Sequence, residues 1–369
     1  MFLDIIKPMS RSKILLVGGH LSPILAILPE LIKQKYQLAV AGRTTTFNDI
    51  KEPSLEYQIL HRHPQLHFYS LNSGRFTQGE WLKLPFEFFR LLKALFKADW
   101  ILKKEKPDLI LSFGGYLSLP ICVLAKLKNI KIRLHEQTIN PGRANRLIAL
   151  LAEKIFVAFP DAVACFSKNK TTVLGIALRD DYKIKNRPNF FKPINKPLLL
   201  IMGGSSGSHS INVITEKLLP KLTKSFQVVH QIGDNRFKDY KRLQPLQSDS
   251  YYPLKYLLPQ TIGYFYHQTD LIVSRSGANT FFELINFQKP AVLIPLPWSA
   301  NQEQLIQAKI LTANKVAYLF NQNEPSDNLY QLIIQASQQL PQLKKNYQTL
   351  DNYAQLIKTP GEFLNRLLA

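Results

Sequence analysis

Short apolar runs alternate with longer stretches of helical periodicity along the chain. The runs are rich in Leu, Ile and Val, which is typical of strands buried on both faces of a parallel sheet. Between them, apolar residues recur every three or four positions, as in 24–33 and 144–151, which predicts helices. This alternation predicts an α/β architecture with parallel sheets. The predicted strands are Lys13–Val17, Gln37–Ala41, Leu109–Phe113, Lys131–His135 and Lys154–Ala158 in a first series, and Leu198–Met202, Gln227–Gln231, Leu271–Ser274 and Ala291–Pro295 in a second.

The two series predict two domains, since 369 residues exceed what one hydrophobic core normally supports. Each series opens with a strand, a glycine turn and a helix, in ILLVGGHLSPILAIL (14–28) and LLLIMGGSSGSHSINVI (198–214). Rossmann-like domains begin in this way, so we expect two such domains facing a cleft. The expected boundaries are 1–180 for the first domain, 181–196 for a charged, proline-containing linker, 197–346 for the second domain, and 347–369 for a helical segment, interrupted at Thr359-Pro360-Gly361, whose return to the first domain is left open.

The chain is strongly basic, with 47 Lys and Arg against 26 Asp and Glu and a formal net charge of +21. Such a charge favours nucleic acid, an anionic membrane surface or phosphorylated substrates as partners, with solubility as the alternative. No zinc-finger spacing or aromatic RNA-binding motif occurs, so nucleic acid is not expected. Aromatic and basic residues mix in 81–106 (WLKLPFEFFRLLKALFKADWILKKEK). This segment suits either an anionic membrane interface or an amphipathic helix packed on the sheet.

Cysteine usage and hydropathy indicate the compartment. Cys122 and Cys165 both lie in apolar surroundings, so a disulfide framework is not expected. The N-terminal residues lack the pattern of a signal peptide, and no apolar run reaches the length of a spanning helix. We therefore expect a cytoplasmic protein that is at most peripheral to a membrane.

The segment DLIVSRSGANTFFE (270–283) predicts a nucleotide site. A strand ends in a tight turn of small residues and a helix begins near Asn279, so unpaired N–H groups and the positive end of the helix dipole offer a phosphate site. Glu283 follows one turn later, where a carboxylate can accept hydrogen bonds from both hydroxyls of a ribose. The turn Gly203–Gly207 is a second anion cradle with two serines, or else a structural strand-to-helix turn.

Polar residues at other strand ends are further candidates. His20 follows the glycines at 18–19 and could act as a general base or be structural. The segment His135–Thr138 places four polar groups at a strand end, which favours a ligand over a surface loop. Arg179 could pair with a diphosphate or be a solvated cation, and the amides in Asn301–Gln304 could read sugar hydroxyls or cap a helix. No zinc spacing, Walker lysine loop or Asp-x-Asp pair appears, so neither a metal nor a cofactor is expected.

Six segments, in order, resemble the MurG family, peripheral membrane transferases that move N-acetylglucosamine from UDP-N-acetylglucosamine to lipid I to form lipid II. The segments are DLILSFGGYLSLP, RLHEQTINPGRANRLIA, GGSSGS, HQIGD, SRSGANTFFE and PLPWSANQEQLIQA. The resemblance runs from about Lys13 to about Phe320. It implies a GT-B fold with the acceptor on the first half and the donor on the second. It also implies a polyprenyl-diphosphate-linked acceptor and a place on the cytoplasmic face of the plasma membrane.

The resemblance also implies roles for individual residues. The residues that would bind the donor are Gly18, Gly19, Thr138, Arg179, Ser205, Ala278, Asn279, Thr280, Phe281, Phe282, Glu283 and Gln304. Of these, Glu283 would take the ribose hydroxyls, Ser205 and the main chain of Ala278–Thr280 the diphosphate, and Gln304 the sugar. The position that faces uracil falls at Pro259 or at Leu258.

The implied chemistry is an inverting displacement in which an acceptor hydroxyl attacks the anomeric carbon as UDP departs. His20 is the expected general base, with Glu136 in reserve. The chain departs from the family pattern in its first turn, where GGTGGH is shortened to Gly18-Gly19-His20, and at Thr138, where the family has asparagine. A transferase for another lipid acceptor, such as diacylglycerol, and a non-catalytic UDP-sugar-binding protein stay open as alternatives.

Overall fold

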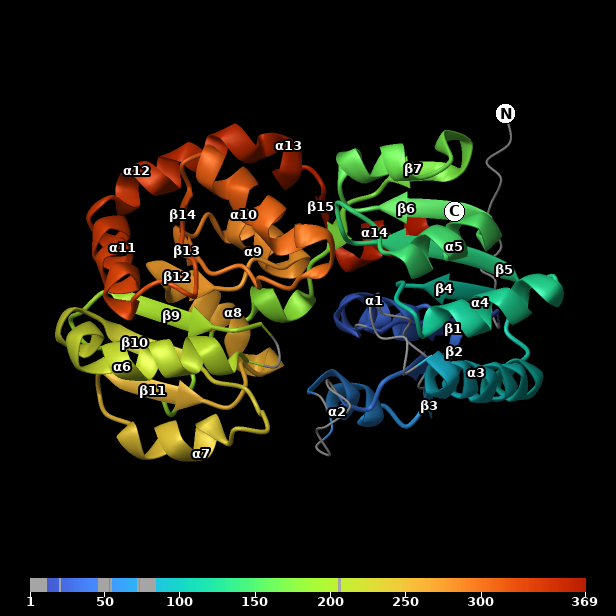
Figure 1. The fold of residues 1–369 in the computed structure, drawn as a ribbon, viewed down its shortest axis with the longest axis horizontal. Helices are drawn as coiled ribbons and strands as arrows, with labels where there is room; N and C mark the ends of the chain where they lie inside the picture. The colour runs from blue at the N-terminus through green and yellow to red at the C-terminus, as the bar shows by residue number, and fades with distance from the viewer. Residues whose placement is uncertain are drawn as a thin grey trace. The chain divides into compact units, whose positions relative to one another are not determined.

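The computed structural model describes residues 12–19, 21–45, 53, 55–71, 73, 84–204 and 207–369, and it divides into two compact α/β units (Figure 1). The first unit consists of the described residues within 1–45, 56–177 and 358–369. The second consists of those within 46–55 and 178–357. Two short strands, β8 (Ile176–Ala177) and β15 (Ile357–Lys358), stand where the chain passes from one unit to the other.

Among its described residues, the first unit has a seven-stranded parallel sheet of order β3-β2-β1-β4-β5-β6-β7. The strands are β1 (Lys13–Val17), β2 (Gln37–Gly42), β3 (Leu66–Ser70), β4 (Leu109–Ser112), β5 (Lys131–Glu136), β6 (Lys154–Val157) and β7 (Thr171–Val173). The helices are α1 (Ser22–Lys33), α2 (Leu55–His61), α3 (Leu84–Glu105), α4 (Ser118–Leu127), α5 (Arg143–Leu151) and α14 (Pro360–Leu368).

The central strand β1 has a continuous run of apolar residues, and the packing of its two faces explains why. Successive side chains of a strand point to opposite faces. Leu15 and Val17 pack with buried residues of α3, α4 and α5 on one face of the sheet (Figure 1). Ile14 and Leu16 pack with buried residues of α1 and α14 on the other face. Because helices cover both faces, no polar position interrupts the strand.

The second unit has, within its described residues, a six-stranded parallel sheet of order β11-β10-β9-β12-β13-β14. The strands are β9 (Leu198–Met202), β10 (Gln227–Gln231), β11 (Tyr251–Leu254), β12 (Leu271–Ser274), β13 (Ala291–Leu293) and β14 (Ala317–Leu319). The helices are α6 (His209–Ser225), α7 (Asp239–Leu243), α8 (Pro259–Gln268), α9 (Ala278–Phe287), α10 (Glu303–Ala313), α11 (Ser326–Gln338), α12 (Leu340–Lys345) and α13 (Asp351–Ala354). In both sheets the strand order reverses at the first strand, and ligands of doubly wound sheets bind at such a reversal.

The predicted strands are confirmed, each within two residues of its observed ends. Two expectations about the chain's organisation differ from the structure. Residues 181–196, expected as a linker, belong to the second unit, where Tyr182 and Phe191 are buried. The segment 347–369 is not helical throughout, since it contains β15, and the expected break at Pro360-Gly361 is the first turn of α14. Thr359 caps that helix reciprocally with Glu362, and proline suits its first position.

Candidate functional site

The turn after β12 brings the N-terminus of α9 to the carboxyl edge of the second sheet. Gly277 is the N-cap residue and has no side chain to cap the helix, which begins at Ala278. No acidic residue lies in the first turn of α9. The first N–H groups of a helix have no helical acceptor, and the helix dipole adds positive charge there. The geometry therefore suits a phosphate group.

Arg275 connects this turn to the glycine turn that follows β9. Its guanidinium donates to the side-chain oxygens of Ser208 at 2.9 Å, Ser210 at 2.8 Å and Gln322 at 2.9 Å. It also donates to the main-chain oxygens of residues 294 and 295. The side chain is buried, and burial lowers the pKa of Arg275 to about 10, so that it stays charged at neutral pH. Each of these acceptors is neutral, so the guanidinium leaves net positive charge beside both turns.

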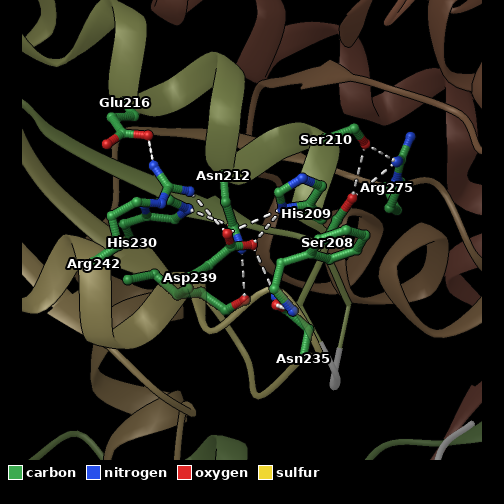
Figure 2. A network of polar contacts seen from close by, with 12 residues as sticks. Ser208, His209, Ser210, Asn212, Glu216, His230, Asn235, Asp239, Arg242 and Arg275 are labelled. Carbon is green, nitrogen blue, oxygen red and sulfur yellow. Dashed lines mark hydrogen bonds and ion pairs between the residues drawn. The ribbon is translucent and has the colours of Figure 1, made fainter. Parts of the chain in front are cut away.

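A network around Asp239 supports the first turn of α6 (Figure 2). The Asp239 carboxylate is fully buried and accepts hydrogen bonds from Asn212 at 2.8 Å, Asn235 at 2.9 Å and Arg242 at 2.8 Å. The Nδ1 atom of His209, the first residue of α6, lies 2.9 Å from the same carboxylate. Five polar side chains thus fix the start of the helix that follows Gly203–Gly207.

His230 extends this network into the core of the second unit. Its Nε2 lies 3.0 Å from Asn212 Oδ1 and its Nδ1 lies 3.0 Å from the Tyr251 hydroxyl. The Asn212 amide nitrogen already donates to Asp239 and to the Ile232 carbonyl, so its oxygen must accept from a His230 Nε2–H. Burial lowers the pKa of His230 to about 3, so the imidazole is neutral.

Glu283 lies one turn into α9 and is buried. Its two carboxylate oxygens accept hydrogen bonds from the hydroxyls of Tyr182 and Tyr266. Burial raises the pKa of Glu283, while these hydroxyls and the charge of Arg179 act in the opposite direction. Arg179 itself pairs with Asp181, with 3.0 Å between Nη2 and Oδ2. The second unit therefore gathers the predicted residues Arg179 and Glu283 in one cluster, together with two tyrosines that belong to none of the predicted motifs.

In the first unit, Glu136 organises a turn at the end of β5. One carboxylate oxygen accepts from the N–H and the hydroxyl of Thr138, both at 2.8 Å, and the other accepts from Asn145 at 2.6 Å. The Asn145 oxygen in turn accepts from the Gly115 N–H at 2.8 Å. Gly114 has a left-handed φ of 78°, and a Cβ there would lie 2.3 Å from Asn145, so only glycine fits. Glu136 is buried, and burial raises its pKa.

Two family models match the chain, the glycosyltransferase family 28 N-terminal domain over residues 17–157 and the glycosyltransferase family 28 C-terminal domain over 198–358. A curated relative from Clostridium novyi is a UDP-N-acetylglucosamine–N-acetylmuramyl-(pentapeptide) pyrophosphoryl-undecaprenol N-acetylglucosamine transferase. It is 32% identical over 311 residues, which is 82% of this chain and 83% of that protein. A relative of the same name from Staphylococcus aureus is 32% identical over 282 residues, 75% of this chain and 76% of that protein. The chain belongs to glycosyltransferase family 28.

Solved structures confirm the GT-B fold expected of a family 28 enzyme. Acinetobacter baumannii MurG superimposes with a TM-score of 0.65 at 23% identity, covering 96% of this chain and 98% of that one. The glycosyltransferase of kitacinnamycin superimposes with a TM-score of 0.67 at 16% identity, covering 97% of each chain. At these identities the likeness concerns the fold alone.

Of the remaining predicted site residues, His20 and Ser205 lie outside the described residues. Gly18 and Gly19 donate their N–H groups to the Ala41 and Gly114 carbonyls, at 3.3 and 3.2 Å. This places the turn after β1 against the neighbouring strand ends.

The first turn of α9 consists of Ala278, Asn279 and Thr280. The rings of the next two residues, Phe281 and Phe282, are buried. If Phe281 and Phe282 contact the donor, they therefore do so through their main-chain atoms. Pro259 is the first residue of α8, with Leu258 as the N-cap. If this position faces uracil, the N–H donor is that of Leu258, since proline has none.

Gln304 fixes the loop that precedes α10. Its side-chain oxygen accepts from the Leu296 N–H at 2.9 Å, and its carbonyl accepts from the Ser276 hydroxyl at 2.7 Å. A contact with a sugar would therefore use the Nε2 donor of Gln304. In the same loop Asn301 and Gln302 have left-handed φ values of 52° and 54°, a strain that is concentrated at functional loops.

Proposed function

We propose that this family 28 enzyme transfers N-acetylglucosamine from UDP-N-acetylglucosamine to lipid I (undecaprenyl-diphospho-N-acetylmuramoyl-pentapeptide), giving lipid II. The observation that carries the proposal is the N-terminus of α9, which has no side-chain cap and no acid in its first turn, with Glu283 one turn further along the same helix. Its first turn suits the diphosphate, and its carboxylate suits the ribose. The curated relatives from Clostridium novyi and Staphylococcus aureus carry this activity in their names.

In the proposed reaction the acceptor hydroxyl loses its proton to a base and bonds to the anomeric carbon, while the bond from that carbon to the diphosphate breaks. Negative charge then grows on the departing UDP. The α9 dipole, Arg275 and Arg179 stabilise this charge more in the transition state than in the bound donor, which lowers the barrier. We assign the base to His20. Glu136, the reserve candidate, has its two oxygens engaged by Thr138 and Asn145, so we assign it to holding the turn after β5.

The test is transfer from labelled UDP-N-acetylglucosamine to a lipid I analogue. We expect His20→Ala to lower kcat by about 10²–10⁴-fold, because a general base contributes that much, with UDP affinity unchanged. His61→Ala, on α2, serves as the control. Turnover of His20→Ala near that of the unaltered enzyme would contradict the assignment. Transfer to diacylglycerol in place of lipid I would favour the other lipid acceptor, and UDP-sugar binding without transfer would favour a non-catalytic protein.

We further propose that the enzyme binds an anionic membrane surface through the aromatic face of α3. This face consists of side chains that are between 50% and 78% exposed, namely Phe86, Phe89, Phe96 and Trp100, with Arg90, Lys93, Lys97 and Lys104 between them. The opposite side of α3 presents Ala94, Ala98 and Ile101 to the core. Packing of α3 on the sheet therefore leaves its aromatic residues available for the proposed membrane contact, because small residues face the core and large aromatic residues stay outside. Among the described residues, no helix has the length and apolarity needed to cross a bilayer.

The double variant Phe96→Ser/Trp100→Ser is expected to bind anionic vesicles at least about tenfold more weakly, because each buried aromatic ring contributes about 1.5–3 kcal/mol. Binding of the unaltered enzyme should also weaken as salt is raised. Vesicle sedimentation measures both effects. Leu246→Ser, which removes an exposed leucine from the second unit, should bind vesicles normally. Equal binding by the double variant and the unaltered enzyme would refute the role of α3.

A further inference from the structure

We infer that Tyr182 and Tyr266 are positioning residues that hold the Glu283 carboxylate in the orientation in which it accepts the 2′- and 3′-hydroxyls of the donor ribose. The inference rests on the proposed function, since it assumes a uridine diphosphate sugar as donor. It adds two side chains to the site and explains how a buried carboxylate can serve as a ribose receptor.

Two hydroxyls from different parts of the second unit fix the carboxylate. Tyr266, on α8, donates to Oε2 of Glu283, and Tyr182 donates to Oε1. The two rings meet edge to face, with centroids 5.2 Å apart and planes at 88°. A carboxylate oxygen can accept a second hydrogen bond, so each oxygen that is held by a tyrosine can still accept from a ribose hydroxyl. With both oxygens held, the carboxylate does not have to lose rotational freedom when the nucleotide binds.

The backbone that carries Tyr182 is itself fixed against α8. At Gly263 a Cβ would lie 2.3 Å from the Ile184 carbonyl oxygen and 2.6 Å from that of Asp181, so only glycine allows this contact. The His267 ring nitrogen Nε2 lies 3.2 Å from the Tyr182 carbonyl oxygen. The main chain that carries Tyr182 is therefore held against α8, and this helps to fix the position of the Tyr182 hydroxyl.

Tyr182 also joins the two groups assigned to the nucleotide. The Arg179 guanidinium lies over the Tyr182 ring, 5.8 Å from its centroid, and belongs to the same short segment. Arg179 is assigned to the diphosphate and Glu283 to the ribose. A single tyrosine thus contacts both receptors, and its hydroxyl opposes the rise in the pKa of Glu283 that burial causes. An ionised carboxylate is the better acceptor for two hydroxyls.

The inference is tested by the dissociation constants of UDP and 2′-deoxy-UDP for the unaltered enzyme, Tyr182→Phe and Tyr266→Phe. The unaltered enzyme should bind UDP at least about tenfold more tightly than 2′-deoxy-UDP, because 2′-deoxy-UDP lacks the hydroxyl that would donate to the charged Glu283 carboxylate. Each phenylalanine variant should bind UDP about three- to tenfold more weakly and 2′-deoxy-UDP almost normally, so that the preference shrinks. In the transfer assay KM for the donor should rise with kcat little changed.

Tyr264→Phe is the matched control, because Tyr264 lies on the same helix and its ring contacts Phe191 and Phe265. It should keep the full preference for UDP. An unchanged preference in both Tyr182→Phe and Tyr266→Phe, or an equal loss of affinity for both nucleotides, would overturn the inference and leave the proposed function standing. Absence of UDP binding by the unaltered enzyme would overturn the proposed function and the inference with it.

Discussion

Replacing Asp239 with alanine is expected to lower the free energy of unfolding of the second unit by about 3–5 kcal/mol. The carboxylate is fully buried, and its removal leaves the guanidinium of Arg242 and the amides of Asn212 and Asn235 without their shared acceptor. Buried polar groups that lose a partner carry the full cost of their desolvation. Arg242 keeps its ion pair with Glu216, which moderates the loss.

The same variant should bind UDP more weakly, because Asn212 and His209 stand in the first turns of α6, directly after the glycine turn expected to bind the diphosphate. Thermal unfolding with and without UDP measures both effects. Asp327→Ala is the control, since Asp327 forms an exposed ion pair with Lys221 and its loss should cost less than about 1 kcal/mol. Equal destabilisation by the two substitutions would show that the network around Asp239 does not support the fold.

The strands that could be predicted from the sequence are the interior ones. β1, β9 and β12 are covered on both faces, so their sequences are apolar except for one terminal residue in β1 and in β12. The strands that the pattern did not reveal include β3, β7, β11 and β14, and all four lie at the edges of the two sheets. Each of these edge strands has at least one residue that is not buried, and in β7 none is buried, so their composition is closer to that of a loop.

Site residues could be predicted where they directly follow a strand in the sequence. They could not be predicted where their hydrogen-bond partners come from distant segments of the chain. The turn before α9 and Glu283 were found because strand, turn and helix are consecutive in the sequence. Tyr182 was missed because it lies 101 residues from Glu283, in a segment whose charges and prolines indicate a linker. Asn145 was missed because its bond to Glu136 depends on how α5 packs against β5. His135, expected near a ligand, is instead buried against Phe363 with Nε2 2.9 Å from the Gly175 carbonyl oxygen.

Acidification from pH 7 to pH 5 is expected to destabilise both units through His135 and His230. Burial lowers the pKa of His135 to about 4 and that of His230 to about 3, below the value of about 6.5 in an unfolded chain. As pH falls below about 6.5, the unfolded chain therefore binds protons that the folded protein does not. The stability due to the neutral imidazoles is present above that pH and falls by about 1.4 kcal/mol per pH unit for each histidine, which is about 2 kcal/mol each at pH 5.

Hydrogen exchange at β5 and β10 reports the two units separately across this pH range. His230→Gln should lower the stability of the second unit at pH 7, because Gln cannot reproduce both hydrogen bonds, to Asn212 and to Tyr251. It should also remove part of the pH dependence of the stability measured at β10, while the pH dependence measured at β5 stays the same. His61→Gln, which replaces an exposed histidine at the end of α2, is the control and should leave both slopes unchanged. An undiminished slope at β10 in His230→Gln would mean that acid destabilises the second unit through groups other than His230.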